Sequence, residues 1–475
     1  MVTVPPERGC YYSHPRRCLK AGALLTHPIP AADSPRIIPR SDHHISRANI
    51  SRNALKVLYR LKDGGYQAFI VGGGVRDLLL NRQPKDFDIA TDASPEQVRA
   101  LFGSARIIGR RFRLVHVRFR DEIVEVATFR GLGNEDLESE DRQILNEAGR
   151  IIKDNSFGSI EEDAWRRDFT VNALYYNIAD FSIWDFVGGM RDVEARRIRL
   201  IGDPETRYRE DPVRMIRAVR LAAKLDLEIH PEAAAPMQRL GSLIDSVPPA
   251  RLFDEFLKVF ETGHALEGYR RLRQHGLFEH LFPATAAWLS GDVSQGRASG
   301  RPGGVADDHR NRFIESALAG TDRRVAEGLP VTPMFLFGVF LWGPVQDRAN
   351  ALRRTGQISE VQALIDAGQE ITDVQIARIT LPRRFSVPMR EMLQLQPRFS
   401  RRQGRRAAVL LQHRRFRAAY DLLVLRTELG EVPAELAEWW MRIQTLSPDD
   451  QHREFNGGRG GGRDAQRPRP AERAV

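Results

Sequence analysis

Cysteine is almost absent from this sequence. Its 475 residues include only Cys10 and Cys18, and both lie in a proline-rich N-terminal stretch. Because no CxxC pair occurs, a zinc site built on paired CxxC motifs is excluded. We interpret the two thiols as incidental and reduced.

Long hydrophobic runs are also missing. No stretch approaches the roughly 20 apolar residues that a membrane helix requires. The N-terminus mixes proline, arginine and histidine and has no continuous apolar core of a signal peptide. We therefore expect a cytoplasmic protein that does not insert into membranes.

Two common nucleotide-binding motifs are absent as well. The sequence contains no GxxxxGK[ST], and no GxGxxG followed by an acidic residue about 20 positions later. Neither a P-loop nor a Rossmann site is therefore supported.

Length and charge set the broad class of the protein. A chain of 475 residues is too long for one core, so several structural units are expected. The formal charge of +10 and the pI near 9.9 suit an anionic partner. A basic balance alone does not identify that partner, because many basic proteins bind nothing special.

The patterning divides the chain into a sheet-bearing part and a helical part. Residues 1–42 lack periodicity and are expected to form a flexible leader. Short apolar or alternating segments then predict strands, and from Ala164 onward the pattern is mostly helical. Residues 451–475 are rich in Gly, Arg and Pro and are expected to be disordered.

Individual elements can be placed within these parts. Strands are predicted at 67–71, 87–90, 113–119 and 123–129, with a short apolar segment at 181–187. Helices are predicted at 46–61 and 75–80, with another starting at Ser94 as N-cap. The stretches 131–163 and 290–308 are polar and are expected to be loops, the first of them mobile.

Asp86 and Asp88 form the first motif that carries chemistry. On a strand, residues two apart face the same way, so both carboxylates project together while Phe87 and Ile89 face the core. Two adjacent carboxylates repel each other unless a cation lies between them, and Mg²⁺ favours oxygen ligands. A lone DxD is weak evidence, because solvated loops contain many.

A glycine run precedes this pair. A strand that ends in Gly72-Gly73-Gly74 and then starts a helix offers backbone N–H groups to a phosphate. Arg76 lies one turn further and can reach the same anion, and Asp77 can hold the loop or Arg76. The alternative is a simple turn of glycines. The two motifs together favour a nucleotide site.

Two further clusters add polar groups. In Arg166-Arg167-Asp168, the arginines suit triphosphate or ribose and the aspartate is a third acid near the metals. Asn172 lies among apolar residues and suggests a partly buried polar face. The alternative is a surface salt-bridge cluster.

Asp211 and Arg214 lie one helical turn apart and present an acceptor beside a donor. This pair matches adenine and cytosine but not guanine or uracil, and it does not separate A from C. The alternative here is a solvated, arginine-rich helix face.

Four blocks in this order resemble the class II nucleotidyltransferase family, which contains bacterial poly(A) polymerases and CCA-adding tRNA nucleotidyltransferases. The blocks are VGGGVRD (71–77), DFDIAT (86–91), RRDFTVNAL (166–174) and EDPVRMIRAVRLAAKL (210–225). Within the family, the segment 107–117 and the arginine-rich stretches 401–406 and 414–421 are similar to the poly(A) polymerase branch. No His-Asp dipeptide occurs, which argues against an appended HD phosphohydrolase domain.

The resemblance implies an α+β fold with a small mixed-sheet nucleotidyltransferase head followed by an all-α neck and body. The expected boundaries are 43–195 for the head, 196–260 for the neck and 261–450 for the body. Nucleotide would be gripped between head and neck.

The resemblance also implies roles for individual residues. Asp86 and Asp88 match the metal-binding carboxylates, and Asp168 the third catalytic acid, with Glu125 as a rival for that third role. Two Mg²⁺ ions are expected, with Mn²⁺ as a substitute. The expected nucleotide contacts are Gly73, Gly74, Arg76, Arg167, Asn172, Asp211, Arg214 and Arg217.

The implied reaction is template-independent transfer of AMP from ATP to an RNA 3′-hydroxyl, with pyrophosphate leaving, which would promote RNA turnover. The expected substrates are 3′ ends of mRNA and of regulatory and decaying RNAs, and a monomer is the default. A CCA-adding tRNA nucleotidyltransferase is the alternative enzyme. A non-catalytic RNA-binding adaptor is disfavoured by the intact acidic residues.

RNA binding is assigned by charge. Between Arg398 and Arg417 there are eight arginines and no acidic residue, with Phe399 and Phe416 interleaved. Arginines bind phosphates and aromatic rings stack on bases, so this segment is expected to hold RNA. The alternative is a solvated helix face. The expected RNA-binding residues are Arg401, Arg402, Arg405, Arg406, Arg414, Arg415 and Arg417.

Overall fold

The computed structural model describes residues 35–109, 113–131, 144–145, 151–153, 157–291, 305–354, 356 and 358–456. Of residues 144–145, 151–153 and 305–308 only the backbone is described. Cys10, Cys18, most of the predicted leader and the end of the predicted tail lie outside these ranges. Within them, no helix has both the length and the apolar character needed to span a bilayer.

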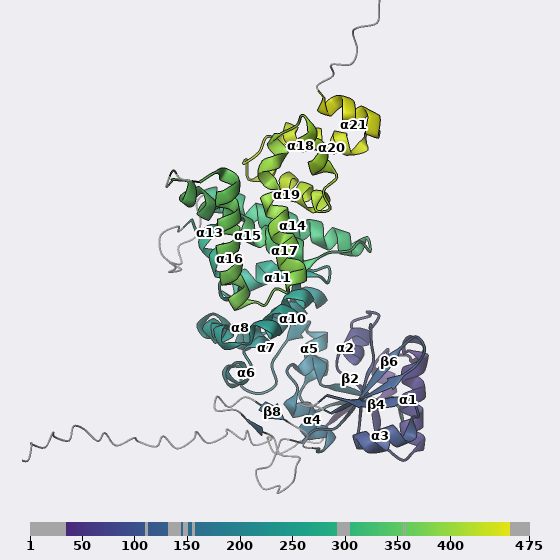
Figure 1. The fold of residues 1–475 in the computed structure, drawn as a ribbon. Coiled ribbons are helices and arrows are strands. Elements are labelled where there is room, and N and C mark those ends of the chain that lie inside the picture. The colour runs from purple at the N-terminus through teal and green to yellow at the C-terminus, as the bar shows by residue number, and fades with distance from the viewer. Residues whose placement is uncertain are drawn as a thin grey trace, which may run out of the picture.

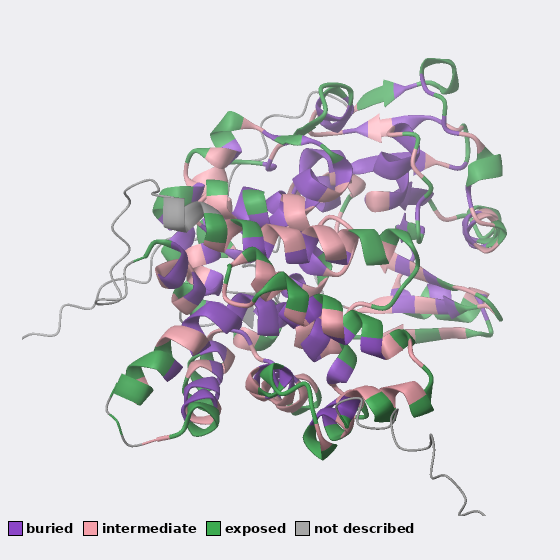
Figure 2. Cartoon of the chain, turned by 90° about the horizontal axis from the view of Figure 1, so that it is seen from above, coloured by how far each residue is buried: buried purple, intermediate pink, exposed green. Residues whose placement is uncertain are grey.

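A sheet-bearing head lies at one end of the molecule, and helices extend from it to the C-terminal elements at the other end (Figure 1). Buried residues fill the interior of both parts (Figure 2). The mixed-sheet α+β class predicted from the sequence is confirmed.

Eight of the described strands of the head form one mixed sheet in the order β1-β10-β9-β2-β3-β6-β5-β4, and β7 (Ile144–Leu145) and β8 (Ile151–Lys153) pair separately. β3 and β6 run parallel, whereas the other neighbours in this sheet are antiparallel. The strands are β1 (Arg36–Ile38), β2 (Ala68–Val71), β3 (Asp88–Thr91), β4 (Ala105–Ile108), β5 (Leu114–Arg118), β6 (Ile123–Thr128), β9 (Leu174–Asn177) and β10 (Ile183–Asp185).

Three of the head helices, α1, α3 and α4, begin at a serine side-chain cap. The Ser51 hydroxyl accepts from the Ala54 N–H, and Ser94 forms a capping box with Gln97. The helices are α1 (Arg52–Asp63), α2 (Gly73–Leu79), α3 (Pro95–Leu101), α4 (Ile160–Arg166) and α5 (Gly189–Glu194), with 3-10 turns η1 (Arg40–Asp42), η2 (Arg47–Asn49) and η3 (Thr170–Asn172).

The rest of the described chain is helical apart from the short parallel pair β11 (Arg197–Ile198) and β12 (Glu228–Ile229). The first group is α6 (Pro204–Glu210), α7 (Val213–Leu225), α8 (Pro231–Ala234), α9 (Met237–Leu240), η4 (Gly241–Ser246) and α10 (Pro249–Phe260). The second group is α11 (Ala265–Gln274), α12 (Phe278–Leu281), α13 (Pro283–Leu289), α14 (Val305–Ala326), α15 (Pro333–Arg354), α16 (Glu360–Arg378), α17 (Arg383–Gln394), η5 (Gln396–Ser400), α18 (Arg405–Leu411), α19 (Phe416–Glu428), α20 (Ala434–Thr445) and α21 (Pro448–Phe455). The division into neck and body at residue 260 stays a prediction.

Four predictions of local structure are wrong where the structure describes the chain. Arg36–Ile38 belong to the sheet, because they pair with β10, which lies far along the sequence. The stretch 131–163 contains β7 (Ile144–Leu145), β8 (Ile151–Lys153) and the start of α4. The predicted loop at 290–308 ends earlier, since α14 begins at Val305, and the predicted tail begins later, since α21 continues to Phe455.

Besides β1, two strands of the eight-stranded sheet were missed: β4 at one edge and β9 in the interior. β9 (Leu174–Asn177) interrupts the region predicted to be helical after Ala164. Its side chains are largely buried and it pairs on both sides, with β2 and β10. A strand that is buried on both faces lacks alternation between polar and apolar residues, so the sequence pattern does not distinguish β9 from a buried helix.

Phenylalanine rings form the core between α10, α12 and α15. Phe340 is fully buried and its ring lies 4.6 to 6.4 Å, centroid to centroid, from four other phenylalanine rings. These rings are Phe256, Phe260, Phe278 and Phe282. This cluster therefore fixes how the three helices pack.

Replacing Phe340 with alanine should lower the free energy of unfolding by about 3–5 kcal/mol, because it leaves a cavity among rings that cannot collapse into it. Chemical denaturation measures this change. The control is Val374→Ala, since Val374 is 60% exposed; its effect should stay within about 0.5 kcal/mol. Equal effects of the two substitutions would contradict this account of the core.

Candidate nucleotide-transfer site

The Asp86 and Asp88 carboxylates lie where β3 begins. Phe87 and Ile89 are buried, whereas Asp86 and Asp88 are exposed. Asp88 is the first residue of β3, and Asp86 lies just before the strand. The predicted alternation is therefore present, although only Asp88 belongs to the strand itself.

Glu125 joins this pair through the parallel strand β6. Ile89 of β3 is in register with Val126 of β6, so Asp88 and Glu125 are neighbours on the same face of the sheet. Glu125 also lies 3.6 Å from the His116 ring on β5. Three carboxylates thus lie on this face of the sheet, where the charges of Glu125 and Asp86 act on Asp88.

Crowding of these charges changes the acidity of Asp88. Although its surface is open to solvent, surrounding protein atoms partly desolvate the carboxylate and raise its pKa to about 6. The negative charges of Glu125 and then Asp86 contribute to this raised pKa, and the positive charge of Arg167 opposes it. The net effect on Asp88 is therefore repulsion from neighbouring carboxylates that Arg167 offsets only in part.

The chemistry of these donors fits a divalent cation. Carboxylate oxygens are the ligands that Mg²⁺ prefers, and a cation would relieve the repulsion that raises the pKa of Asp88. Within the described ranges, however, no three His, Cys, Asp or Glu side chains form a compact group that could hold a metal ion. Nucleotide phosphates commonly supply further ligands to Mg²⁺.

The glycine turn lies against the strand that carries the aspartates. Gly72 has φ +72° and ψ −132°, which a side chain rarely tolerates. A Cβ on Gly74 would lie 3.3 Å from side-chain atoms of Ile70 and Phe87 and 3.5 Å from the Asp86 carbonyl oxygen. The turn is thus packed directly on the segment that holds Asp86, and Gly73 begins α2 beside it.

Arg76 is held inside the protein rather than extended into solvent. It is only 5% exposed, and its Nε and Nη2 donate to Asp77 Oδ1 at 2.9 and 2.7 Å. Its Nη1 donates to Asn172 Oδ1. Asp77 therefore holds Arg76, one of the two roles expected for it, and Asn172 and Arg76 are brought together as predicted site residues.

Arg167 lies between the glycine turn and Asp88. Its guanidinium donates to Asp163 Oδ2, to the Tyr175 hydroxyl and to the Asn172 carbonyl. A Cβ on Gly72 would lie 3.5 Å from Arg167 Nη1, and the Arg167 charge acts on Asp88. Asp163 and Tyr175 escaped the sequence analysis because nothing in their local pattern shows that they hold this arginine.

Asp168 is engaged by groups other than the carboxylate cluster. Its Oδ2 accepts from Arg217 Nε and Nη2 at 2.8 and 2.5 Å, and its Oδ1 accepts from Asn172 Nδ2 at 3.2 Å. Burial disfavours the charge, but Arg217 on α7 outweighs it and lowers the pKa of Asp168. The predicted site residue Arg217 is therefore the ion-pair partner of Asp168, and this ion pair links the head to α7.

The predicted base-recognition residues both have partners. Asp211 follows the end of α6 and accepts from Arg251 Nη1 and Nη2 at 2.8 and 2.6 Å. Arg214 Nη1 donates to the Arg207 carbonyl and to Glu210, each at 2.8 Å. Arg251 on α10 was not predicted, because it lies 40 residues from Asp211 along the chain.

The arginine-rich segment divides into paired and unpaired members. Arg414 and Arg415 both bind Glu391, and Arg417 binds Asp421. In contrast, five arginines are exposed and form no ion pair with any residue in the described ranges. These are Arg398, Arg401, Arg402, Arg405 and Arg406.

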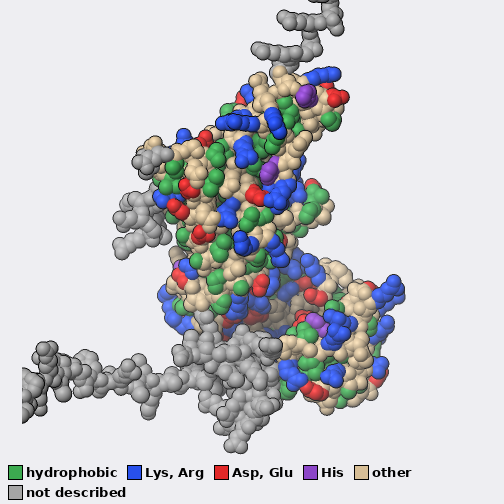
Figure 3. Space-filling view, in the orientation of Figure 1, with side chains coloured by type: hydrophobic (Ala, Val, Ile, Leu, Met, Phe, Trp, Pro, Cys, Tyr) green, Lys and Arg blue, Asp and Glu red, His purple; other side chains and the backbone are tan. Residues whose placement is uncertain are grey.

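The prediction that Phe399 and Phe416 stack on bases is wrong. Phe399 is fully buried and Phe416 is 5% exposed, and both rings pack against Trp440. The sequence pattern could not show this, because the helix face on which a ring lies depends on distant partners. Lys and Arg side chains are nevertheless visible over the C-terminal elements (Figure 3).

The raised pKa of Asp88 predicts a pH-dependent stability. Below the ordinary pKa of 3.8 the Asp88 carboxyl is neutral in both the folded and the unfolded chain, so its ionisation does not lower the free energy of unfolding. As the pH rises through about 6, the folded protein acquires a disfavoured charge. Asp88→Asn should therefore raise the melting temperature at pH 8 in a chelator, and this gain should shrink as the pH falls towards 4.

Addition of Mg²⁺ should raise the melting temperature of the unsubstituted protein at pH 8 more than that of Asp88→Asn, because the ion relieves the same repulsion. A gain from Asp88→Asn that is equal at pH 8 and pH 4 would contradict the assigned crowding of charges.

Three family profiles match the chain. They are described as "Poly A polymerase head domain" over residues 68–199, "Probable RNA and SrmB- binding site of polymerase A" over 226–289 and "Polymerase A arginine-rich C-terminus" over 356–474.

Individual proteins similar to this chain belong to the same group of enzymes as the family profiles. Poly(A) polymerase I of Escherichia coli O6:H1 is 48% identical over 418 residues, which cover 87% of each chain. The CCA-adding enzyme of Bacillus subtilis is 37% identical but matches 48% of this chain and 55% of its own length. The Thermotoga maritima CCA-adding enzyme, solved with tRNA, shares the fold with a TM-score of 0.53 at 18% identity, covering 84% of each chain. The chain therefore belongs to the bacterial poly(A) polymerase I family.

Proposed function

We propose that this chain is a poly(A) polymerase that transfers AMP from ATP to the 3′-hydroxyl of RNA without a template and releases pyrophosphate. The observation that carries this proposal is the placement of Asp86, Asp88 and Glu125 on one face of the sheet, with the glycine turn packed on the Asp86 backbone. The long, high-identity match to poly(A) polymerase I of E. coli supports the same activity.

Asp86, Asp88 and Glu125 are the residues that would hold Mg²⁺, or Mn²⁺ in its place. When bound, two such ions lower the pKa of the attacking hydroxyl and neutralise the leaving oxygens. With a pKa near 6, Asp88 is mostly ionised at neutral pH and is available as a ligand. Arg167 supplies the positive charge next to it.

Glu125 is the better candidate for the third carboxylate. Its charge acts on Asp88 more strongly than that of Asp86, and the parallel pairing of β3 and β6 puts it on the same face. Asp168 instead accepts two hydrogen bonds from the Arg217 guanidinium and one from the Asn172 side-chain amide. We therefore assign Asp168 a positioning role at the joint between the head and α7.

The triphosphate would lie over the glycine turn. Gly73 is half-buried at the start of α2, and Arg167 lies beside Gly72 of the turn. Arg76 and Asn172 fix each other and so stabilise its shape. Arg167 would then provide a preorganised positive charge to the phosphates.

Recognition of the base is assigned to Asp211 and Arg214. Because Arg251 binds both oxygens of Asp211, and Arg214 is bound by Glu210 and a carbonyl, their positions are fixed before nucleotide arrives. This pair does not by itself separate A from C. The preference for AMP over a CCA-adding activity rests on the relatives, since the B. subtilis CCA-adding enzyme matches only about half of this chain.

RNA 3′ ends would be the acceptor, held in part by the exposed arginines near residues 401–406. Tailing would then promote turnover of mRNA and of regulatory and decaying RNAs. The monomeric state and the cytoplasmic location remain predictions.

The activity is tested by incubating the protein with a generic RNA, Mg²⁺ and each nucleoside triphosphate separately. We expect a long ladder of products with ATP alone, analysed on a denaturing gel. CMP incorporation that stops after a few nucleotides would instead indicate a CCA-adding enzyme. No extension with any nucleotide would contradict catalysis altogether.

The carboxylate assignments predict distinct kinetic effects. Asp86→Ala, Asp88→Ala and Glu125→Gln should each reduce kcat for AMP addition by about a hundredfold or more, because each removes a ligand that stabilises charge in the transition state. Asp168→Asn should chiefly raise the KM for ATP, because it loosens Arg217. If Glu125→Gln kept normal kcat while Asp168→Asn abolished it, Asp168 would be the third catalytic acid.

A further inference from the structure

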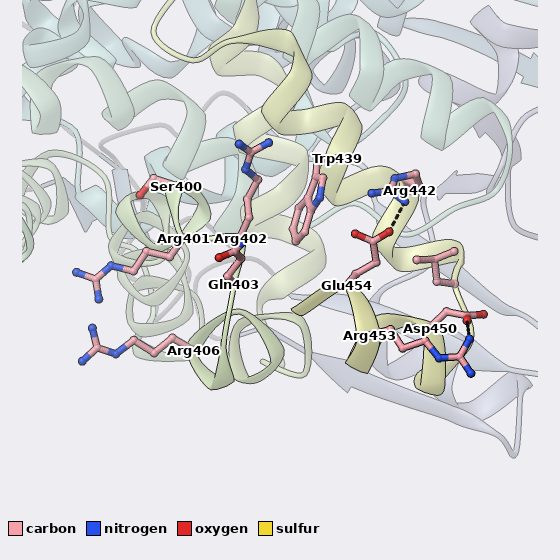
Figure 4. A pocket seen from close by; sticks show the side chains of 11 residues that line it. Ser400, Arg401, Arg402, Gln403, Arg406, Trp439, Arg442, Asp450, Arg453 and Glu454 are labelled. Atoms are coloured by element: carbon pink, nitrogen blue, oxygen red, sulfur yellow. Dashed lines mark hydrogen bonds and ion pairs between the residues drawn. The ribbon is translucent and has the colours of Figure 1, made fainter. Parts of the chain in front are cut away.

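A pocket of about 1100 Å³ lies at the C-terminal end of the described chain, between η5, α18, α20 and α21. It is lined by five arginines and two acidic residues, which leaves three positive charges in excess. A tryptophan, Trp439, stands in its wall (Figure 4). None of the roles assigned above uses this tryptophan.

The positive charges of the pocket fall into two groups. Arg442 binds Glu454 at 2.8 Å and Arg453 binds Asp450 at 3.2 Å, so these two are already neutralised. Arg401, Arg402 and Arg406 are exposed and have no ion pair within the described ranges. Unpaired arginines in a concave surface attract phosphate groups.

Trp439 presents an aromatic surface beside these arginines. It is half-buried, and its ring is held edge-on by Trp440, with the two ring centroids 4.8 Å apart at 89°. On another side it contacts Phe455 of α21. Figure 4 shows the ring between the segment that carries Arg402 and the ion pair of Arg442 with Glu454.

The pocket is a rigid feature of the fold. Trp440 is fully buried and its Nε1 donates to the Phe399 carbonyl at 2.9 Å, which fixes α20 against η5. The Gly404 N–H donates to the Phe455 carbonyl at 2.7 Å, which fixes the arginine-bearing loop against α21. The buried rings Phe399 and Phe416 thus support this wall instead of contacting a ligand.

We infer that this pocket binds single-stranded RNA, with one base stacked on Trp439 and the adjoining phosphates on Arg401, Arg402 and Arg406. An aromatic face beside a line of free cations is the arrangement that holds single strands with little sequence preference. An acidic protein segment would use the arginines but has no need of the ring. The inference rests on the proposed function, in which RNA is the acceptor.

The position of the pocket identifies which part of the RNA it binds. In Figure 1, α18, α20 and α21 lie at the opposite end of the molecule from the head that carries Asp88. The RNA in the pocket is therefore upstream of the 3′ end that reacts. A short primer cannot occupy both places at once, whereas a long RNA can.

This geometry predicts a defect that depends on RNA length. Trp439→Ala should raise the KM for long single-stranded RNA about fivefold or more, which is the loss expected for one stacked base. With the shortest primers, its kcat and KM should match those of the unsubstituted enzyme. Trp439→Phe keeps an aromatic face and should restore most of the affinity for long RNA.

The arginines are tested by the salt dependence of RNA binding. Replacing Arg401 and Arg402 with glutamine should flatten the slope of log K against log salt by about 1.4, or 0.7 per phosphate contact. The matched control is Arg323→Gln with Arg353→Gln, which removes two exposed body arginines outside the pocket. This control should leave the slope nearly unchanged.

A spectroscopic readout separates stacking from a structural role. RNA should quench the fluorescence of the unsubstituted protein more than that of Trp439→Phe, because a stacked base quenches the indole of Trp439. Melting temperatures of all variants verify that the fold is intact.

Each negative result would contradict a different part of the proposal. A Trp439→Ala defect that is equal at all primer lengths, or absent at all lengths, would overturn the pocket assignment while AMP addition continued. Equal slopes for the two double variants would overturn the phosphate contacts. If the unsubstituted protein extended no primer with ATP, the proposed function itself would fail.

Discussion

Repulsion between carboxylates is the constraint around which the head is organised. The parallel pairing of β3 with β6 makes Asp88 and Glu125 neighbours, and the segment entering β3 adds Asp86. Ionised carboxylates this close repel each other when no cation is present, and this repulsion contributes to the raised pKa of Asp88. A bound cation would relieve this repulsion, and in the proposed function the glycine turn next to it would accommodate the phosphates that accompany such an ion.

Ion pairs around this cluster connect the head to the helices that follow. Arg167 is paired with Asp163, Asp168 with Arg217 and Asp211 with Arg251, so the polar groups of the proposed nucleotide site are held by ion pairs. Removing one member of such a pair leaves the other uncompensated, which is costly away from solvent. Preorganised charge of this kind stabilises a transition state without reorganisation during the reaction.

The sequence predicted the features that depend on neighbouring residues. The strand, glycine turn and helix of residues 68–79, the alternation at Asp86 to Ile89 and the capped start of α3 all lie within short segments. The predictions that failed depend on distant partners. β1 requires β10, Phe399 is buried by Trp440, and Arg251 reaches Asp211 from another helix. Glu125 was recognised only as a rival because parallel register between β3 and β6 is not visible in one sequence.

The central claim is that Asp86, Asp88 and Glu125 bind divalent ions together with nucleotide. The most direct measurement is electron paramagnetic resonance of Mn²⁺ in the presence of a non-reactive ATP analogue. We predict two bound ions per chain in the unsubstituted protein and a loss of at least one in Glu125→Gln, with Asp168→Asn unchanged. Normal Mn²⁺ binding by Glu125→Gln together with loss in Asp168→Asn would contradict the account.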